Sequence, residues 1–170
     1  MPKSADASIV ISIAPFASAF TAPVANQNIT LTNISPTNMA FDPGKTNSRR
    51  VAVTAPTGSG TSSYIEGSIS ISAPGTGNGR SLNLGFRVVE VQPSVPVPSG
   101  APYMLVGLVF SGTGDLTGVN FPDFEKNSDG SLVVTDSDGN TSATTYEFLL
   151  LVQNNKGGIA LIDPRIINMP

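Results

Sequence analysis

The sequence predicts an all-β protein, a single antiparallel β-sandwich of the immunoglobulin-like type with about nine or ten short strands over residues 1–170. Apolar and polar residues alternate with a period of two along most of the chain, which is the pattern of strands with one buried face. Clusters of Gly, Pro, Asn, Asp and Ser separate the alternating runs and indicate turns. No segment shows a convincing helical period.

Five alternating runs predict strands in the first half of the chain, at 8–13, 29–32, 50–53, 65–71 and 82–91. In the last of these runs, the apolar residues change parity after Val88, which predicts a β-bulge near Val88-Val89. The following residues, 91–102, contain too many prolines for a central strand, and the sequence predicts a semi-rigid loop or an edge crossing there.

Four runs predict strands in the second half, at 103–110, 131–136, 146–153 and 159–163. The runs 103–110 and 146–153 are apolar on both faces, whereas a two-layer sandwich buries one face of each sheet. The second face therefore needs a cover, which is either the loop 91–102 or the N-terminal segment of the same chain, or a neighbouring subunit.

The alternation also predicts which side chains form the core. The inward positions of the expected strands are Ile9, Ile11, Leu31, Val53, Ile69, Leu84, Phe86, Val106, Leu108, Phe148, Leu150 and Val152.

The composition excludes several classes of function. The chain has no Cys and no His, so thiol chemistry, Ser-His-Asp triads and the usual zinc, copper and haem sites are excluded. Nine Lys and Arg residues are scattered and the net charge is −3, so no basic surface for nucleic acid is present. The sequence predicts no enzyme, no catalytic residues and no cofactor.

One loop resembles a calcium-binding pattern. Asp136, Asp138, Asn140 and Glu147 fall at the first, third, fifth and twelfth positions of such a loop. However, the sixth position is Thr141 instead of Gly, and no helices flank the loop. Asp138-Gly139 between two strands is typical of a plain hairpin turn, so the sequence predicts no metal site here. The alternative is weak surface calcium, because the carboxylates of the same region could gather at one end of the sandwich: Asp123, Glu125, Asp129, Asp136 and Asp138.

The stretch "YEFLLLVQNNKGGIALIDPRIIN" (146–168), preceded by "GSLVVTDSDGN", has the form Tyr-x-Phe-x-Leu-x-Val, a turn, and Asp-Pro-x-Ile-x-Asn. Over roughly residues 103–170 the chain resembles small bacterial β-sandwich proteins whose last strand carries Asp-Pro, the DP-EP family. It is more distantly similar to inclusion-body (PixA-like) proteins. The resemblance implies a cytoplasmic or assembly-forming bacterial protein with no established activity, and it supplies no catalytic residues.

The Asp163-Pro164 pair interrupts the last expected strand. Proline has no N–H to donate to a sheet, so the sequence predicts that Pro164 lies on an edge strand and blocks pairing there.

Two further features concern location and partners. No run approaches the ~18–20 apolar residues of a membrane span. Ser alternates with Ile near the N-terminus, Asp6 lies in the region that a signal peptide keeps basic, and Pro15 interrupts the apolar run. The sequence therefore predicts a cytoplasmic protein or part of an assembled particle. The predicted function is a structural, self-assembling homo-oligomer, with a calcium- or carbohydrate-binding module as the alternative.

Overall fold

A computed structural model describes the chain in the ranges 4–13, 31, 34, 38–41, 51–54, 68–72, 81–90, 103–110, 121, 123–137, 144–155 and 157–169. This part of the chain is all-β, as predicted, and it contains eleven strands in two sheets and no helix. No helix that could cross a membrane occurs in these ranges. The predicted loop 91–102 and most of the predicted strand 29–32 lie outside them.

The strands are β1 (Ala7–Ile13), β2 (Asn38–Phe41), β3 (Val51–Thr54), β4 (Ser68–Ser72), β5 (Leu82–Glu90), β6 (Tyr103–Phe110), β7 (Asp123–Lys126), β8 (Leu132–Asp136), β9 (Thr144–Asn154), β10 (Ile159–Ile162) and β11 (Arg165–Met169). Sequence reasoning missed β2 and β7, and it ended the last strand at Asp163-Pro164, whereas β11 follows this pair. In β7 the single apolar side chain is Phe124 among charged residues, and four residues are too few to show a period of two.

The first sheet has the strand order β2-β1-β5-β8-β7. Its central pair, β1 and β5, runs parallel, with Ala7 opposite Leu84 and Ile13 opposite Glu90. The prediction of a purely antiparallel arrangement is therefore wrong. The predicted bulge near Val88-Val89 is also wrong, since β5 pairs with β1 without a shift of register through Glu90.

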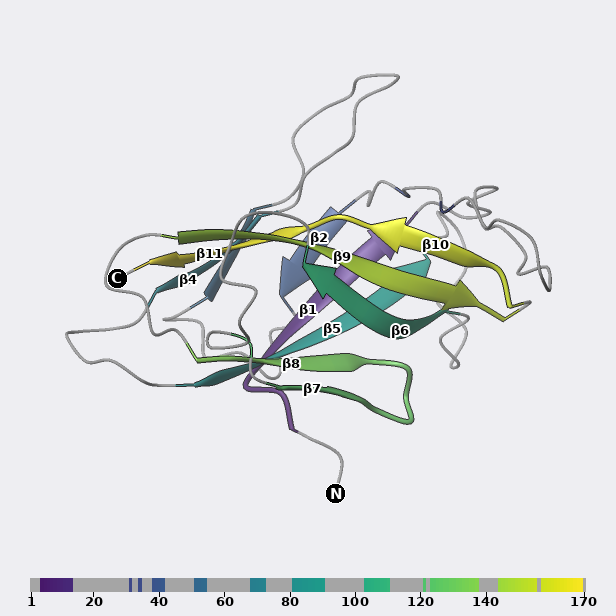
Figure 1. Cartoon of the computed structure of the whole chain (residues 1–170), viewed down its shortest axis with the longest axis horizontal. Coiled ribbons are helices and arrows are strands. Elements are labelled where there is room, and N and C mark those ends of the chain that lie inside the picture. The colour runs from purple at the N-terminus through teal and green to yellow at the C-terminus, as the bar shows by residue number, and fades with distance from the viewer. Residues whose placement is uncertain are drawn as a thin grey trace, which may run out of the picture.

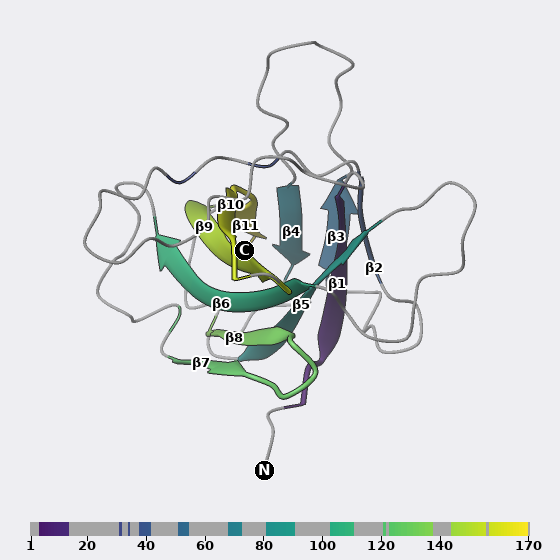
Figure 2. The same cartoon turned by 90° about the vertical axis from the view of Figure 1, so that its right-hand side faces the viewer.

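The second sheet has the order β10-β9-β11-β4-β3, and β6 pairs with β9. Leu150 of β9 lies opposite both Leu108 of β6 and Ile162 of β10, so β9 runs between these strands. Figure 1 shows β9 with β6 on one side and the yellow β10–β11 segment on the other. The pairing of β11 with β4 is the second parallel one, and Figure 2 shows β3 and β4 side by side in the same sheet.

The inward faces of both sheets contribute to one hydrophobic core. Eight of the predicted core residues are buried: Ile9, Ile11, Ile69, Leu84, Phe86, Phe148, Leu150 and Val152. Val53 and Leu108 are partly buried and pack against this cluster. The prediction is wrong for Leu31, whose side chain is 41% exposed.

The structure also corrects the inward face of β6. Its register against β9 shifts between Leu105 and Gly107, which is a β-bulge at Val106. The extra residue changes the parity of the strand, so that Tyr103 and Leu105 are buried before the bulge and Leu108 packs on the core after it. Val106 itself is only half-buried, which explains why the prediction of Val106 as a core residue fails.

Candidate functional site

The structure separates the residues of the predicted cation loop. Asp136 ends β8 with its side chain fully buried, whereas Glu147 is exposed on the outward face of β9, opposite Arg165. Asp138 and Asn140 lie outside the described residues. Among the described residues, no group of three or more Asp or Glu side chains could hold a metal ion. Asp136 and Glu147 therefore do not belong to one site.

Asp136 instead joins the two sheets. The side-chain amide of Asn168 in β11 donates a hydrogen bond of 3.0 Å from Nδ2 to Oδ1 of Asp136 in β8, and both side chains are fully buried. A side-chain hydrogen bond contributes about 0.5–1.5 kcal/mol net to stability, and removing one buried partner costs more because the other is left unsatisfied. Asn168 is the Asn of the Asp-Pro-x-Ile-x-Asn motif, so this motif residue has a structural role.

Pro164 lies between β10, which ends the strand order of the second sheet, and β11, which has neighbours on both sides, so the prediction that the proline blocks pairing is wrong. β10 and β11 pair with β9 in one common register: Ile162 lies opposite Leu150 and Arg165 lies opposite Glu147. Beyond Pro164, β11 has β4 as its second neighbour. The backbone N–H of Phe148 donates a hydrogen bond to the carbonyl of Pro164 at 3.3 Å. The proline therefore still accepts a hydrogen bond from β9, and it lacks the bond that a backbone N–H at position 164 would donate.

The outward face of the second sheet carries a row of apolar side chains on three adjacent strands. We call this row the outer strip, and its members are Met104, Val109, Leu149, Leu151, Ile159 and Leu161. Val109 lies directly opposite Leu149, and Leu151 lies directly opposite Leu161. Val109 is 55% exposed and Met104 is 37% exposed, while the other four are half-buried.

Gly107 lies in the middle of the outer strip, opposite Leu151. A methyl group at this position would lie 3.9 Å from Cβ of Leu151, which is an ordinary van der Waals distance. Position 107 therefore contributes no side chain to the centre of the strip, and it has room for a small one.

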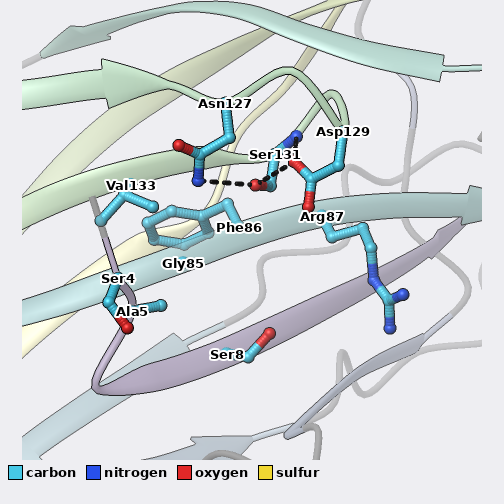
Figure 3. Close-up of a pocket in the computed structure, with 10 residues that line it drawn as sticks. All are labelled: Ser4, Ala5, Ser8, Gly85, Phe86, Arg87, Asn127, Asp129, Ser131 and Val133. Atoms are coloured by element: carbon cyan, nitrogen blue, oxygen red, sulfur yellow. Dashed lines mark hydrogen bonds between the residues drawn. The ribbon is translucent and has the colours of Figure 1, made fainter. Parts of the chain in front are cut away.

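The outward face of the first sheet has a different, polar character. A pocket of about 390 Å³ lies there, and its lining includes Ser4, Ser8, Arg87, Asp129 and Ser131. Figure 3 shows Asn127, Asp129 and Ser131 of the β7–β8 turn on one side of β5, with Ser4, Ala5 and Ser8 on the other. Asp129 was a sequence-based candidate, as one of the carboxylates near the possible calcium loop, whereas the other polar residues of this pocket were not.

One signal in the sequence could have indicated the pocket. Gly85 interrupts the alternating run 82–91, and a glycine within a strand often marks the close approach of another backbone or a ligand. In the structure, Ala5 lies over Gly85: a methyl group at position 85 would be 2.6 Å from Cβ of Ala5.

No protein-family model matches the chain, and no curated protein matches its sequence. The resemblance to the DP-EP family therefore stays a prediction that rests on the quoted residues.

Proposed function

We propose that the chain is a structural protein with an immunoglobulin-like β-sandwich fold that self-associates through the outer strip. The proposal is supported by two sheets that share one core and by a second sheet whose outward face is also apolar. The single observation that carries it is the row of six apolar side chains on β6, β9 and β10.

The outer strip leaves apolar side chains in contact with water. Burying a Leu, Ile, Val or Met side chain fully contributes about 1.5–3 kcal/mol. Because Val109 and Met104 are the most exposed members, an approaching copy of the chain would gain most by covering the β6 side of the strip. The positions along β6 that face outward offer no charge against such an approach.

The low charge of the whole chain also favours self-association. Charged residues make up 12% of the sequence and the net charge is −3, so electrostatic repulsion between copies is weak. A homo-oligomer or a larger assembly is the expected product, and a second copy is the expected partner.

The test places a charge in the outer strip and an identical charge outside it. Val109→Lys introduces a cation at the most exposed member of the strip, and Thr145→Lys introduces one on an exposed outward position of β9 beyond Glu147. Multi-angle light scattering with size-exclusion chromatography measures the mass of each variant. We expect a wild-type oligomer that Val109→Lys dissociates and that Thr145→Lys leaves intact, with unchanged circular dichroism in both.

A wild-type monomer at high protein concentration would overturn the proposal. In that case the strip would be covered within one chain, and Leu149→Ser and Leu151→Ser would change stability alone. An oligomer that both lysine variants leave intact would place the interface on another surface and would also contradict it.

A further inference from the structure

We infer that the pocket on the outward face of the first sheet binds a small, neutral, hydroxyl-rich molecule, a monosaccharide unit. This inference is independent of self-association, because the pocket and the outer strip lie on different sheets.

The glycine at the centre of the sheet face lets the N-terminal segment come close enough to form a wall of the pocket, because Ala5 occupies the space that a side chain at position 85 would fill. Ser8 of β1 and Val133 of β8 both lie directly opposite Gly85 of β5, so three neighbouring strands present a hydroxyl, no side chain and a small apolar group in one row. The N-terminal segment forms one wall: Asp6 donates its N–H to the carbonyl of Asn83 at 2.8 Å, and its Oδ2 accepts the N–H of Asn83 at 2.9 Å. These two bonds hold the wall to the sheet.

The opposite wall is the β7–β8 turn, whose polar side chains are fixed by one another. Oδ1 of Asp129 accepts hydrogen bonds from the backbone N–H of Ser131 at 2.9 Å and from its hydroxyl at 2.6 Å. The amide of Asn127 donates to the same hydroxyl at 3.2 Å. Gly130 has a φ of 84°, a conformation that side chains rarely adopt, and its carbonyl accepts from the N–H of Leu105 at 3.1 Å. The turn is therefore held in place before any ligand arrives.

The volume and the lining together select the class of ligand. About 390 Å³ lies at the small end of the range for ligand pockets, about 300–1,000 Å³. Most such pockets are predominantly apolar, whereas this one is lined mainly by hydroxyl, amide, carboxylate and guanidinium groups. A sugar hydroxyl both donates and accepts, and it matches a surface that offers Ser hydroxyls beside a carboxylate and an amide.

The charges in the pocket favour a neutral ligand. Arg87 carries a cation and Asp129 an anion at the same pocket, so an ionic ligand attracted by one is repelled by the other. Figure 3 shows the guanidinium of Arg87 extending away from Asp129, so the two charged groups line different parts of the pocket. A ring with several hydroxyl groups can engage both.

The affinity should be modest. The ring of Phe86 belongs to the core and is fully buried, so the part of the pocket that the structure describes offers no aromatic face for a sugar to stack on. Hydrogen bonds exchanged with water contribute little net free energy each. Millimolar dissociation constants are expected.

The test is a titration of the ¹⁵N-labelled full chain with glucose, galactose, mannose and N-acetylglucosamine and their methyl glycosides, followed by amide chemical shifts. Glycine and inorganic phosphate serve as zwitterionic and anionic probes. Ser8→Val replaces a hydroxyl of the lining with methyl groups on a side chain that suits a strand, and Asp129→Asn keeps the shape of the turn but changes an acceptor. Thr145→Val on the other sheet is the matched control.

We expect saturable shifts at Ser8, Gly85 and Ser131 with at least one sugar. Binding should weaken about tenfold in Ser8→Val and in Asp129→Asn, which corresponds to about 1.4 kcal/mol and to the loss of one hydrogen bond. Thr145→Val should bind as the wild type does. A response to the methyl glycoside as well as the free sugar identifies a sugar unit within a glycan, and a response to the free sugar alone identifies a free monosaccharide. No saturable shift with any sugar, a response confined to glycine or phosphate, or sugar binding that survives Ser8→Val would each overturn the inference.

Discussion

Gly85 shows how a single hydrogen in place of a methyl group controls the path of a neighbouring segment. Ala5 approaches this position so closely that a Cβ there would lie 2.6 Å from the Cβ of Ala5, well below contact distance. The atom in conflict is a Cβ attached to backbone and cannot rotate away, so the N-terminal segment would have to move. Such a movement would strain the bonds between Asp6 and Asn83.

The substitution Gly85→Ala should therefore lower the free energy of unfolding by about 1–3 kcal/mol, the usual cost of inserting a methyl group into a packed contact. Ala5→Gly removes the opposing methyl group, so the double variant should regain most of the loss. Urea unfolding of the two single variants and the double variant measures this coupling. Equal losses in Gly85→Ala and in the double variant would show that the contact with Ala5 does not limit position 85.

At the scale of elements, β10 and β11 behave as one strand. Both pair with β9 in the same register, and Asp163-Pro164 neither adds nor removes a residue from the ladder. Ile162, Pro164 and Ile166 are all buried, so the alternation of faces also continues across the proline. The proline stands where the second neighbour of this strand changes: Ile34 donates its N–H to Leu161 at 2.7 Å before it, and β4 pairs with β11 after it.

Replacing Pro164 should therefore leave the sheet intact. In Pro164→Val the new N–H faces β9, and it should be protected from hydrogen exchange by the carbonyl of Phe148. The free energy of unfolding should change by less than about 1 kcal/mol, because a net hydrogen bond of about 0.5–1.5 kcal/mol opposes the added freedom of the unfolded chain, about 0.4–1 kcal/mol. Hydrogen-exchange NMR and urea unfolding measure both effects. Rapid exchange of the new amide at position 164 would contradict this place of the proline in the ladder.

At the scale of the whole molecule, aromatic side chains connect the two sheets. The rings of Phe86 in β5 and Phe148 in β9 lie 5.7 Å apart in an edge-to-face arrangement. The ring centroid of Phe110 in β6 lies 6.3 Å from that of Phe148 and 4.8 Å from that of Phe121. The ring centroids of Phe121 and Tyr146 lie 5.0 Å apart. Such pairs contribute about 0.5–1.5 kcal/mol beyond the burial of their area. Phe148 therefore contacts aromatic partners on both sheets.

Phe148→Ala should lower the free energy of unfolding by about 3–5 kcal/mol, since it leaves a cavity between the sheets. The matched control is Phe124→Ala on β7, where the side chain is 56% exposed and a change within about 0.5 kcal/mol is expected. Thermal and urea unfolding compare the two. Similar losses in both variants would contradict the assignment of Phe148 to the contact between the sheets.

The sequence alone determined most of the longer strands and the faces that they bury. Ile9, Ile11, Leu84 and Phe86 could be assigned to the core because the period of two is a local property of each run. Where the local pattern was short or charged, as in β7, it gave no signal. At Val106 the alternation was misleading, since a bulge that the pairing with β9 reveals moves the inward positions by one residue.

Only the tertiary structure decided the direction of the neighbours and the location of the candidate site. Parallel and antiparallel strands show the same alternation, so the pairing of β1 with β5 and of β11 with β4 could not be read from it. Asp136 meets Asn168 across 32 residues. The pocket combines Ser8, Gly85 and Asp129, which are distant in sequence. Such contacts depend on how the two sheets pack. The alternation along each strand is compatible with many arrangements of the strands, and the packing of the shared core decides which one forms.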